Sequence, residues 1–272
     1  MSELRIGFQG ARGAYSEEAT FSFFGPGVRA VPLPSFRAVF EAVTQGQVDG
    51  GVVPVENSLA GSVIENVDLL IEFPVTITGE LALHIQHCLL APAGTALADV
   101  ERALSHPQAL AQCTAFLRQH GITPVPESDT AGAAMRLSEQ RTPRSAAIAS
   151  RNAATLYGLT VLQEAIQDTP GNYTRFVSFG APPVRQGSKS KTAVVLTVEN
   201  VPGALHRVLG AFANRGLDLI RLETRPLRRR GEYFFCLDIH GAKEEPTLAA
   251  ALEEAQRSCS TFRVLGSYRV AD

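Results

Sequence analysis

The sequence predicts an α/β protein whose 272 residues form two domains. In residues 1–182, short apolar runs alternate with segments of helical periodicity, which is typical of a mostly parallel sheet with short connections. In residues 190–272, the expected elements follow the order β-α-β-β-α-β, which is the ferredoxin-like arrangement. Residues 181–190 between them are rich in Pro, Gly and Ser, as expected of a linker.

Local signals bound the elements of the first domain. Apolar runs predict strands at 5–8, 30–33, 51–55, 81–90, 146–149 and 175–179. Helices are expected to begin at four capping residues: Ser35, Ser62, Ser105 and Asp129. Ser62 and Ser105 are followed three residues later by Glu and Gln, which makes each a capping box.

Similar start and stop signals bound the elements of the second domain. Strands are expected at 192–198, 217–224, 233–239 and 262–268, and helices at 203–214 and 247–257. Pro202 and Gly216 flank the first of these helices, as start and stop signals should. The basic run 228–231 is expected to be a solvated hairpin tip.

Composition excludes several classes of function. A formal charge of -2 and 45% hydrophobic residues indicate a globular protein that does not bind nucleic acid or an anionic membrane as its main partner. No apolar run approaches the roughly 20 residues of a membrane span, and the N-terminus lacks a secretory signal. The four cysteines and six histidines show no metal-binding spacing. We therefore expect a cytoplasmic protein with reduced thiols and no metal.

Polar clusters lie where expected strands lead into helices, which is where ligands bind in such sheets. The first is the loop 10–16, Gly-Ala-Arg-Gly-Ala-Tyr-Ser, whose backbone N–H groups suit a carboxylate. A plain tight turn explains its glycines equally well. The spacing is not that of a dinucleotide site, and Glu17 and Glu18 would compete for the positive end of the helix.

Two further clusters follow at 54–61 and 105–113. In the first, Glu56 raises the option of a tuned acid or base, although such a loop also forms simply to satisfy its own backbone. In the second, Gln108 and Gln112 share one helix face and could hold a polar ligand. The capping box explains Gln108 without a function, and a histidine beside a cap, here His106, is more often structural.

The segment 172–176, Asn-Tyr-Thr-Arg-Phe, follows a turn and opens a strand. Thr174 offers a hydroxyl that can donate a hydrogen bond. Arg175 offers a guanidinium that can hold a carboxylate through two parallel bonds. Both residue types also begin strands for ordinary reasons, so this segment gains weight only together with the other clusters.

Together these segments resemble the prephenate dehydratase family with a C-terminal ACT regulatory domain. The resemblance covers nearly the whole chain, in order, through GARGAYSEEA (10–19), GVVPVENSLAG (51–61), SHPQALAQC (105–113), AAIAS (146–150), NYTRF (172–176), NVPGAL (200–205) and ETRP (223–226). It implies conversion of prephenate to phenylpyruvate, water and carbon dioxide, without a cofactor. The family fold implies a cleft between two α/β lobes, as in periplasmic-type binding proteins. Because the first strand begins near the N-terminus, the chorismate mutase segment of bifunctional relatives is not expected.

The resemblance also implies roles for residues. It places Thr174 at the departing ring hydroxyl. A hydroxyl is too weak an acid to give up its proton outright, so we expect Thr174 to donate a hydrogen bond in the transition state. Arg175 is expected to anchor a substrate carboxylate. Glu56 is expected either to organise its loop or to supply the proton path.

Other residues are expected to orient the substrate. Asn57, Ser105 and Gln112 match family positions that line the site, and we expect them to stabilise charge there. The remaining expected substrate contacts are Gly13, Tyr15, Ser16, Ser58 and Phe176.

In the ACT domain the resemblance implies phenylalanine as a feedback effector. The expected effector contacts are Gly203, Ala204, Leu205, Asp218, Glu223, Thr224, Arg225 and Pro226. Thr224 replaces the usual Ser, and Asp218 stands where Asn is usual. An Asp can accept from the ammonium of an amino acid but cannot donate to its carboxylate. An ACT domain retained only for dimerisation is the alternative.

Two other functions stay open at this point. An arogenate dehydratase would handle the amino analogue of the side-chain ketone. A non-catalytic sensor of a small anion would need Arg175 and the glycine loop but not Thr174. We expect a homodimer or homotetramer that pairs through its ACT domains and shares an effector site between subunits.

Overall fold

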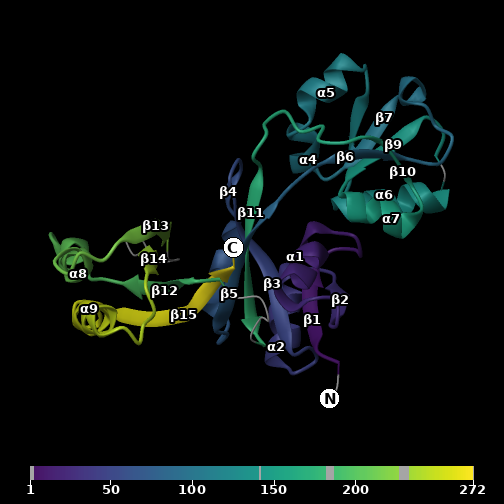
Figure 1. The fold of residues 1–272 in the computed structure, drawn as a ribbon. Helices are drawn as coiled ribbons and strands as arrows, with labels where there is room; N and C mark the ends of the chain where they lie inside the picture. Colours follow the sequence, from purple (N-terminus) through teal and green to yellow (C-terminus); the bar gives the residue numbers. More distant parts are fainter. Residues whose placement is uncertain (1–2, 141, 182–186, 227–232, 272) are drawn as a thin grey trace.

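The N-terminal lobe is built on a sheet covered by helices on both faces (Figure 1). The protein is represented by a computed structural model, which describes residues 3–140, 142–181, 187–226 and 233–271. Val52 packs with the first helix and its neighbour Val53 with the second, because successive side chains of a strand point to opposite faces. The elements are β1 Arg5–Gln9, α1 Tyr15–Phe24, β2 Arg29–Leu33, α2 Phe36–Thr44, β3 Gly50–Asn57, β4 Gly61–Ser62, α3 Ile64–Glu72, β5 Ile77–His84 and, returning later, β11 Tyr173–Gly180.

The second lobe holds a five-stranded sheet of its own. Alanines of one helix, among them Ala133 and Ala134, lie in the core beside Ala147 and Ala149, so the helix packs closely on the sheet. The elements are β6 Cys88–Ala91, the short 3-10 helix Leu97–Asp99, β7 Arg102–Ser105, α4 Pro107–Ala111, α5 Thr114–Gln119, β8 Thr123–Pro126, α6 Thr130–Gln140, β9 Ser145–Ala149, α7 Arg151–Tyr157 and β10 Thr160–Gln163. The strand order is β10-β6-β9-β7-β8.

The C-terminal domain follows the predicted β-α-β-β-α-β order. Its elements are β12 Lys189–Thr197, α8 Ala204–Ala213, β13 Leu219–Pro226, β14 Tyr233–His240, α9 Pro246–Arg257 and β15 Thr261–Ala271. Both helices pack on one face of the sheet, around Val194 and Leu237. The opposite face, through Val195 and Cys236, packs against the N-terminal lobe.

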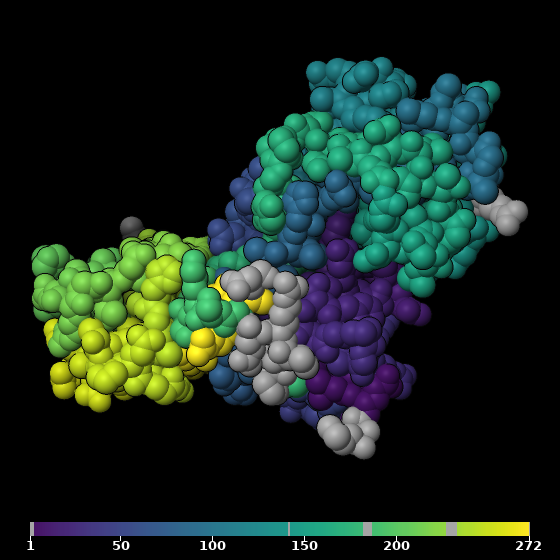
Figure 2. Space-filling model, in the orientation of Figure 1, coloured from purple at the N-terminus to yellow at the C-terminus, as the bar shows by residue number. Residues whose placement is uncertain are grey.

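One sheet of ten described strands joins the C-terminal domain to the N-terminal lobe. Its order is β13-β14-β12-β15-β5-β11-β3-β1-β2, with β4 paired to β3. The joint is the parallel pairing of Arg269 and Val270 with Gly79 and Glu80. A Cβ atom on nearby Gly266 would lie 2.3 Å from the Ile77 carbonyl oxygen, so only glycine permits this approach. Figure 2 shows the resulting shape, with the C-terminal domain projecting from one side of the two stacked lobes.

The two-lobed α/β fold and the ferredoxin-like domain are confirmed, with local corrections. The expected strand 81–90 is wrong as one element, because it splits into β5 and β6 in two different sheets. The sheets are mixed rather than mostly parallel, since β11 runs antiparallel to both β3 and β5. The expected hairpin tip 228–231 and linker residues 182–186 lie outside the described residues.

Helix capping was predicted correctly at two of four starts. Ser35 accepts from the backbone of α2, and Asp129 Oδ1 accepts from the N–H of Gly132 in α6. Ser62 is not a cap, because its hydroxyl donates to Glu223 in the C-terminal domain. At α4 the side chain of His106, not that of Ser105, accepts from the helix backbone. In the part of the chain that the structure describes, the helices are too short or too polar to cross a membrane.

Candidate active site

A cavity of about 400 Å³ lies between the two lobes, a size typical of small-molecule sites. The first turns of α1, α4 and α6 and the ends of β3 and β11 contribute to its wall. Its polar lining residues are Gln9, Tyr15, Ser16, Asn57, His87, His106, Gln108, Gln112, Ser128, Asp129, Thr130, Asn172 and Thr174. Its larger apolar lining residues are Phe36, Pro54, Val63, Ile85 and Phe176.

Strand alternation decides which neighbouring side chains reach this cleft. In the antiparallel pairing of β11 with β3, Thr174 lies opposite Asn57, and Arg175 lies opposite Glu56. Successive residues of a strand point to opposite faces. Thr174 and Asn57 therefore line the cleft, and the next pair points away from it.

Buried amides surround the Thr174 hydroxyl. The Nδ2 of Asn57 lies 3.0 Å from Thr174 Oγ1 and 2.7 Å from the Oδ1 of Asn172. The Nδ2 of Asn172 lies 3.1 Å from the Oε1 of Gln112, which comes from the other lobe. Thr174 is thus part of a hydrogen-bonded chain that crosses between the lobes.

His87 stands at the far end of this chain. Its Nε2 lies 2.9 Å from Gln112 Oε1 and its Nδ1 lies 3.0 Å from the hydroxyl of Tyr15. Burial lowers the pKa of His87, and the hydrogen bond to Gln112 opposes this only in part. The ring is therefore neutral near neutral pH.

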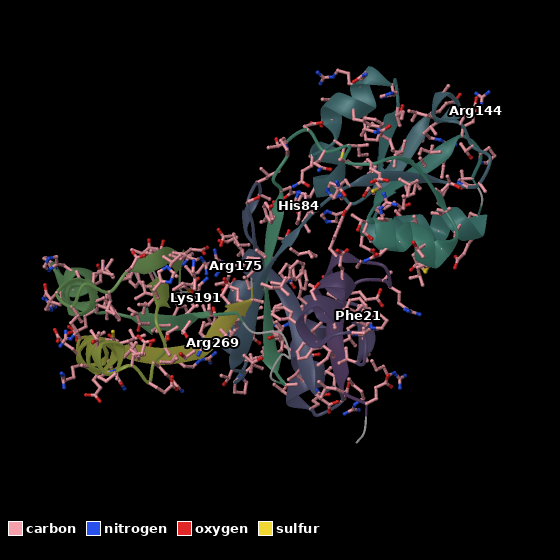
Figure 3. All side chains as sticks on the ribbon, in the orientation of Figure 1. Phe21, His84, Arg144, Arg175, Lys191 and Arg269 are labelled. Carbon is pink, nitrogen blue, oxygen red and sulfur yellow. The ribbon has the colours of Figure 1, made fainter. Side chains whose placement is uncertain are left out.

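Arg175 does not reach the cleft, contrary to expectation. Its guanidinium forms ion pairs with Glu56 at 3.1 Å, Glu80 at 3.1 Å and Asp238 of the C-terminal domain at 2.7 Å. Figure 3 shows Arg175 near Lys191, where the C-terminal domain meets the central sheet. The expected role as carboxylate anchor is corrected, because the side chain lies on the other face of β11 and its charge is already neutralised.

Glu56 does not reach the cleft either, so its expected role in the proton path is corrected, whereas its role in organising the loop stays a prediction. It lies on the face of β3 that points away from the cleft and pairs with Arg175. The lining residues of the cleft, within the described part of the chain, include no lysine or arginine.

Three expected site residues serve the scaffold instead. The N–H of Gly13 donates to Glu17 at 2.6 Å, and a Cβ atom on Gly13 would lie 3.0 Å from Ala153 Cα of the second lobe. This glycine therefore allows close contact between the lobes. Buried Ser105 donates to the Ile148 carbonyl oxygen at 2.6 Å. The hydroxyl of Ser58 accepts from the backbone of β11.

The structure brings the other expected residues together and adds some that sequence reasoning missed. Tyr15, Ser16 and Phe176 line the cleft with Asn57, Gln112 and Thr174. Asn172 and His87 were missed. Asn172 could have been found, because it lies two residues before Thr174 and so shares its side of the strand. His87 carried no signal, since nothing in the sequence places it beside Gln112.

The comparison with protein families decides the identity of the fold. The prephenate dehydratase family matches residues 6–183, and the ACT domain family matches residues 192–256. The chain belongs to the prephenate dehydratase family.

Relatives of this prephenate dehydratase family member include plant and bacterial enzymes. It is 40% identical to the arogenate dehydratase/prephenate dehydratase 2 of Arabidopsis thaliana over 281 residues, which covers 99% of this chain and 74% of the relative. It is 39% identical to a bifunctional chorismate mutase/prephenate dehydratase of Pseudomonas aeruginosa over 268 residues, which covers 97% of this chain and 73% of the relative.

Solved structures of similar chains share the whole architecture. A prephenate dehydratase from Arthrobacter aurescens in complex with L-Phe has a TM-score of 0.89 at 34% identity and covers 98% of this chain and 90% of its own. GqqA, described as a novel type of quorum quenching acylase, has a TM-score of 0.88 at 36% identity and covers 98% of both chains.

The ACT domain of this dehydratase family member does not gather its expected effector residues within one chain. The paired register places Thr224 opposite Phe235, at the end of the strands from which the loop to Gly203 departs. Asp218 precedes β13 at the opposite end of the strands, beside His240. Ala204 and Leu205 begin α8 directly after Gly203, and Pro226 ends β13 two residues after Thr224.

Two residues of the ACT domain form side-chain contacts with the N-terminal lobe. Glu223 accepts from Ser62 at 2.9 Å, and Arg225 pairs with Asp68 of α3 at 2.9 Å. Thr224 between them points to solvent. Any ligand that binds Glu223 or Arg225 must therefore compete with their contacts to Ser62 and Asp68 of the N-terminal lobe.

Proposed function

We propose that this chain is a prephenate dehydratase, which removes water and carbon dioxide from prephenate to give phenylpyruvate. The observation that carries the proposal is the Thr174 hydroxyl in the cleft, which accepts a hydrogen bond from Asn57 at 3.0 Å. An amide N–H can only donate, so the proton of Thr174 stays available. Among the described residues it has no acceptor, which leaves it for a ligand.

The reaction needs a hydrogen-bond donor at one oxygen atom. The bond between the ring and its carboxylate breaks, and the electron pair moves through the ring to expel the ring hydroxyl. A proton, ultimately from solvent, converts the departing hydroxide to water. Thr174 is suited to donate to that oxygen as negative charge develops on it, and Asn57 strengthens this donor by polarising its oxygen.

The cleft suits the loss of a carboxylate as carbon dioxide. With Arg175 turned away, neutral groups such as Gln108, Gln112 and Ser16 face the substrate. A strong ion pair would stabilise the carboxylate in the ground state and oppose its loss. Neutral donors beside Phe176 and Pro54 hold the substrate without that penalty.

The test is the formation of phenylpyruvate from prephenate by the purified full-length protein. We expect saturable turnover that falls at least about 100-fold in Thr174→Ala. A folded protein that turns over neither prephenate nor arogenate would overturn the proposed enzymatic activity.

Arogenate is the alternative substrate, and Asp129 provides the means to test it. Asp129 is the carboxylate among the described lining residues, so it is the group suited to accept from the ammonium of arogenate. Asn caps a helix as well as Asp does, so Asp129→Asn should keep α6 intact. If arogenate is the substrate, this change lowers its kcat/KM about tenfold more than that of prephenate. Equal effects on both substrates would remove Asp129 from recognition.

An acylase reaction, as described for GqqA, finds less support in this cleft. Attack on an amide needs a nucleophile with a base within hydrogen-bond reach. The Thr174 oxygen accepts from an amide, and within the described residues no histidine or carboxylate bonds to it. The same geometry that favours Thr174 as a donor disfavours it as a nucleophile.

We further propose that phenylalanine binds between the ACT domains of two copies of this chain and inhibits the enzyme. Asp218 and the loop at Gly203 lie at opposite ends of the strands of one ACT sheet, so a site that uses both requires two chains. The solved Arthrobacter aurescens relative contains L-Phe, which supports this amino acid as the effector. Calorimetry with millimolar phenylalanine is the direct test, and absence of heat would favour an ACT domain that serves dimerisation alone.

A reducing compartment fits the cysteines, and we propose the cytoplasm. Cys88, Cys113, Cys236 and Cys259 are all free thiols. Burial raises the pKa of Cys113 to about 12, which keeps it protonated and unreactive.

A further inference from the structure

His87 is a buried group of the cleft that takes no part in the reaction proposed for Thr174. The residue is only 3% exposed, and both ring nitrogens have partners. A neutral imidazole carries its proton on one nitrogen only. The hydrogen-bonded chain between His87 and Thr174 determines which one.

The direction of that chain is fixed at the Thr174 end. The Oδ1 of Asn57 accepts from the backbone N–H groups of Leu59 at 3.1 Å and Ala60 at 3.0 Å. Backbone N–H groups can only donate, so the oxygen and nitrogen of this amide cannot be exchanged. The Nδ2 of Asn57 is therefore a donor, and its acceptors are Asn172 Oδ1 at 2.7 Å, Thr174 Oγ1 at 3.0 Å and, at the longer distance of 3.2 Å, the Tyr173 carbonyl oxygen.

From there each partner follows in turn. The Oδ1 of Asn172 accepts from Asn57, so its Nδ2 donates to the Oε1 of Gln112. That oxygen also faces the Nε2 of His87 at 2.9 Å, and an oxygen acceptor requires the proton on Nε2. The Nδ1 of His87 is then unprotonated, and it lies 3.0 Å from the hydroxyl of Tyr15.

We propose that His87 is a positioning residue that holds Gln112 by donating from Nε2, so that the amide nitrogen of Gln112 faces the substrate. Two donors, His87 and Asn172, converge on one oxygen of Gln112 and prevent the amide from turning over. The amide Nε2 of Gln112 has no acceptor among the described residues, as expected of a group that donates to a substrate carboxylate. A reversed amide would present its oxygen to that carboxylate and repel it.

Tyr15 contacts His87 from the other side. Its hydroxyl lies 2.8 Å from the Gln86 carbonyl oxygen as well as 3.0 Å from His87 Nδ1, and its ring meets the imidazole edge-on at 5.6 Å. The hydroxyl has a single proton, which it can donate either to the carbonyl oxygen or to an unprotonated Nδ1. Tyr15 therefore permits the tautomer that Gln112 requires, and the contact with Gln112 is what selects it.

The first test reads the tautomer directly and does not depend on activity. The protein has six histidines, so selective ¹⁵N labelling of imidazoles gives few signals, and the signal lost in His87→Gln identifies His87. At about pH 8 we expect the proton on Nε2 and an unprotonated Nδ1. A proton on Nδ1 alone would overturn the proposal.

The second test measures the role in turnover and rests on the function proposed above. In His87→Gln, an amide nitrogen can take the place of Nε2, whereas His87→Leu keeps the bulk and removes the donor. We expect kcat/KM for prephenate to fall at least about tenfold in the leucine variant and to stay within about threefold in the glutamine variant. His120→Leu, at an exposed position of the second lobe, is the matched control.

The outcomes separate the two proposals. If the wild-type protein turns over neither substrate, the proposed function fails while the tautomer result still stands. If the leucine and glutamine variants lose activity equally in an active enzyme, the positioning role of the Nε2 donor is overturned.

Discussion

Thr174 and Asn57 work as a pair, in which one residue fixes what the other can do. The Asn57 amide is held by two backbone N–H groups and donates to the Thr174 oxygen. The hydroxyl proton is thereby left for an acceptor other than Asn57. In the proposed reaction this donor is in place before the substrate arrives, so little reorganisation is needed at the moment of reaction.

Replacing Thr174 by Val keeps the shape of the side chain and removes the hydroxyl. We expect kcat to fall about 100-fold or more with KM within about threefold, because the donor acts in the transition state. Steady-state kinetics with prephenate measures this. Thr174→Ser is the control and should keep most of the activity, and an unchanged kcat in the valine variant would remove Thr174 from the mechanism.

We expect His87 to make the free energy of unfolding depend on pH in the acidic range. Burial lowers its folded pKa, so below the unfolded value of about 6.5 the unfolded chain binds more protons than the folded one. The free energy of unfolding should therefore decrease as pH falls from about 6.5 toward the folded pKa, by at most about 1.4 kcal/mol per pH unit from this group. Above about pH 7.5 the group should have no effect.

Urea unfolding at about pH 7.5, 6.5 and 5.5 checks this expectation. His87→Gln should show a shallower loss of stability than the wild type over this range. His120→Gln, exposed on the second lobe, should behave as the wild type does. Equal slopes in His87→Gln and wild type would contradict the assignment.

At the scale of elements, β11 separates two functions by its two faces. Thr174 on one face serves the cleft, and Arg175 on the other joins a buried ion cluster with Glu80, Lys191 and Asp238. Glu80 lies on β5 of the N-terminal lobe, and Lys191 and Asp238 lie on the ACT strands β12 and β14. A single peptide bond thus connects the Thr174 residue of the cleft to the contact between domains.

Breaking this cluster should cost stability. Asp238→Asn removes one charge and leaves the buried guanidinium of Arg175 under-compensated, which destabilises the protein by roughly 3 kcal/mol. Thermal and urea unfolding measure the change. Asp218→Asn is the matched control, because Asp218 is 75% exposed and its replacement should change stability by less than about 0.5 kcal/mol. Similar values for both variants would show that the cluster contributes little.

The strand β11 and the presence of Thr174 in the cleft could be predicted from the sequence. The wrong expectation for Arg175 has a geometric reason. The run 175–179 predicted a strand, and the match to NYTRF pointed to Thr174. The same strand assignment implies that Thr174 and Arg175 point to opposite faces, so both cannot reach one ligand. Applying that rule would also have turned Glu56 away from Asn57. The partners of Arg175 could not be predicted, because Glu80 and Asp238 meet it only through tertiary packing.

At the scale of the molecule, the outer edge of the ACT sheet is suited to pairing with a second copy. β13 is the edge strand of the described sheet, and Ile220 and Leu222 on it are 43% and 47% exposed. An unpaired edge with exposed apolar side chains is an association surface. Pairing of two chains along this edge would also supply both parts of the proposed effector site, Asp218 from one chain and the Gly203 loop from the other.

Leu222→Asp should therefore weaken the proposed dimer. Two chains that meet at this edge would each bury a carboxylate, so we expect at least about a tenfold higher dissociation constant, measured by light scattering over a dilution series. Leu156→Asp, at a similarly exposed leucine of α7, is the control. An unchanged mass distribution in the Leu222 variant would place the interface elsewhere.

The joint between β15 and β5 also has a consequence for the making of the protein. β5 obtains its second neighbour only when Arg269 and Val270 arrive, after nearly the whole length of the chain that follows Gly79 has been translated. At about 5–20 residues per second, one edge of the central sheet stays unpaired for about 10–40 s on the ribosome. During that interval the nascent lobe presents an open strand edge to its surroundings, and such an edge can pair with other chains.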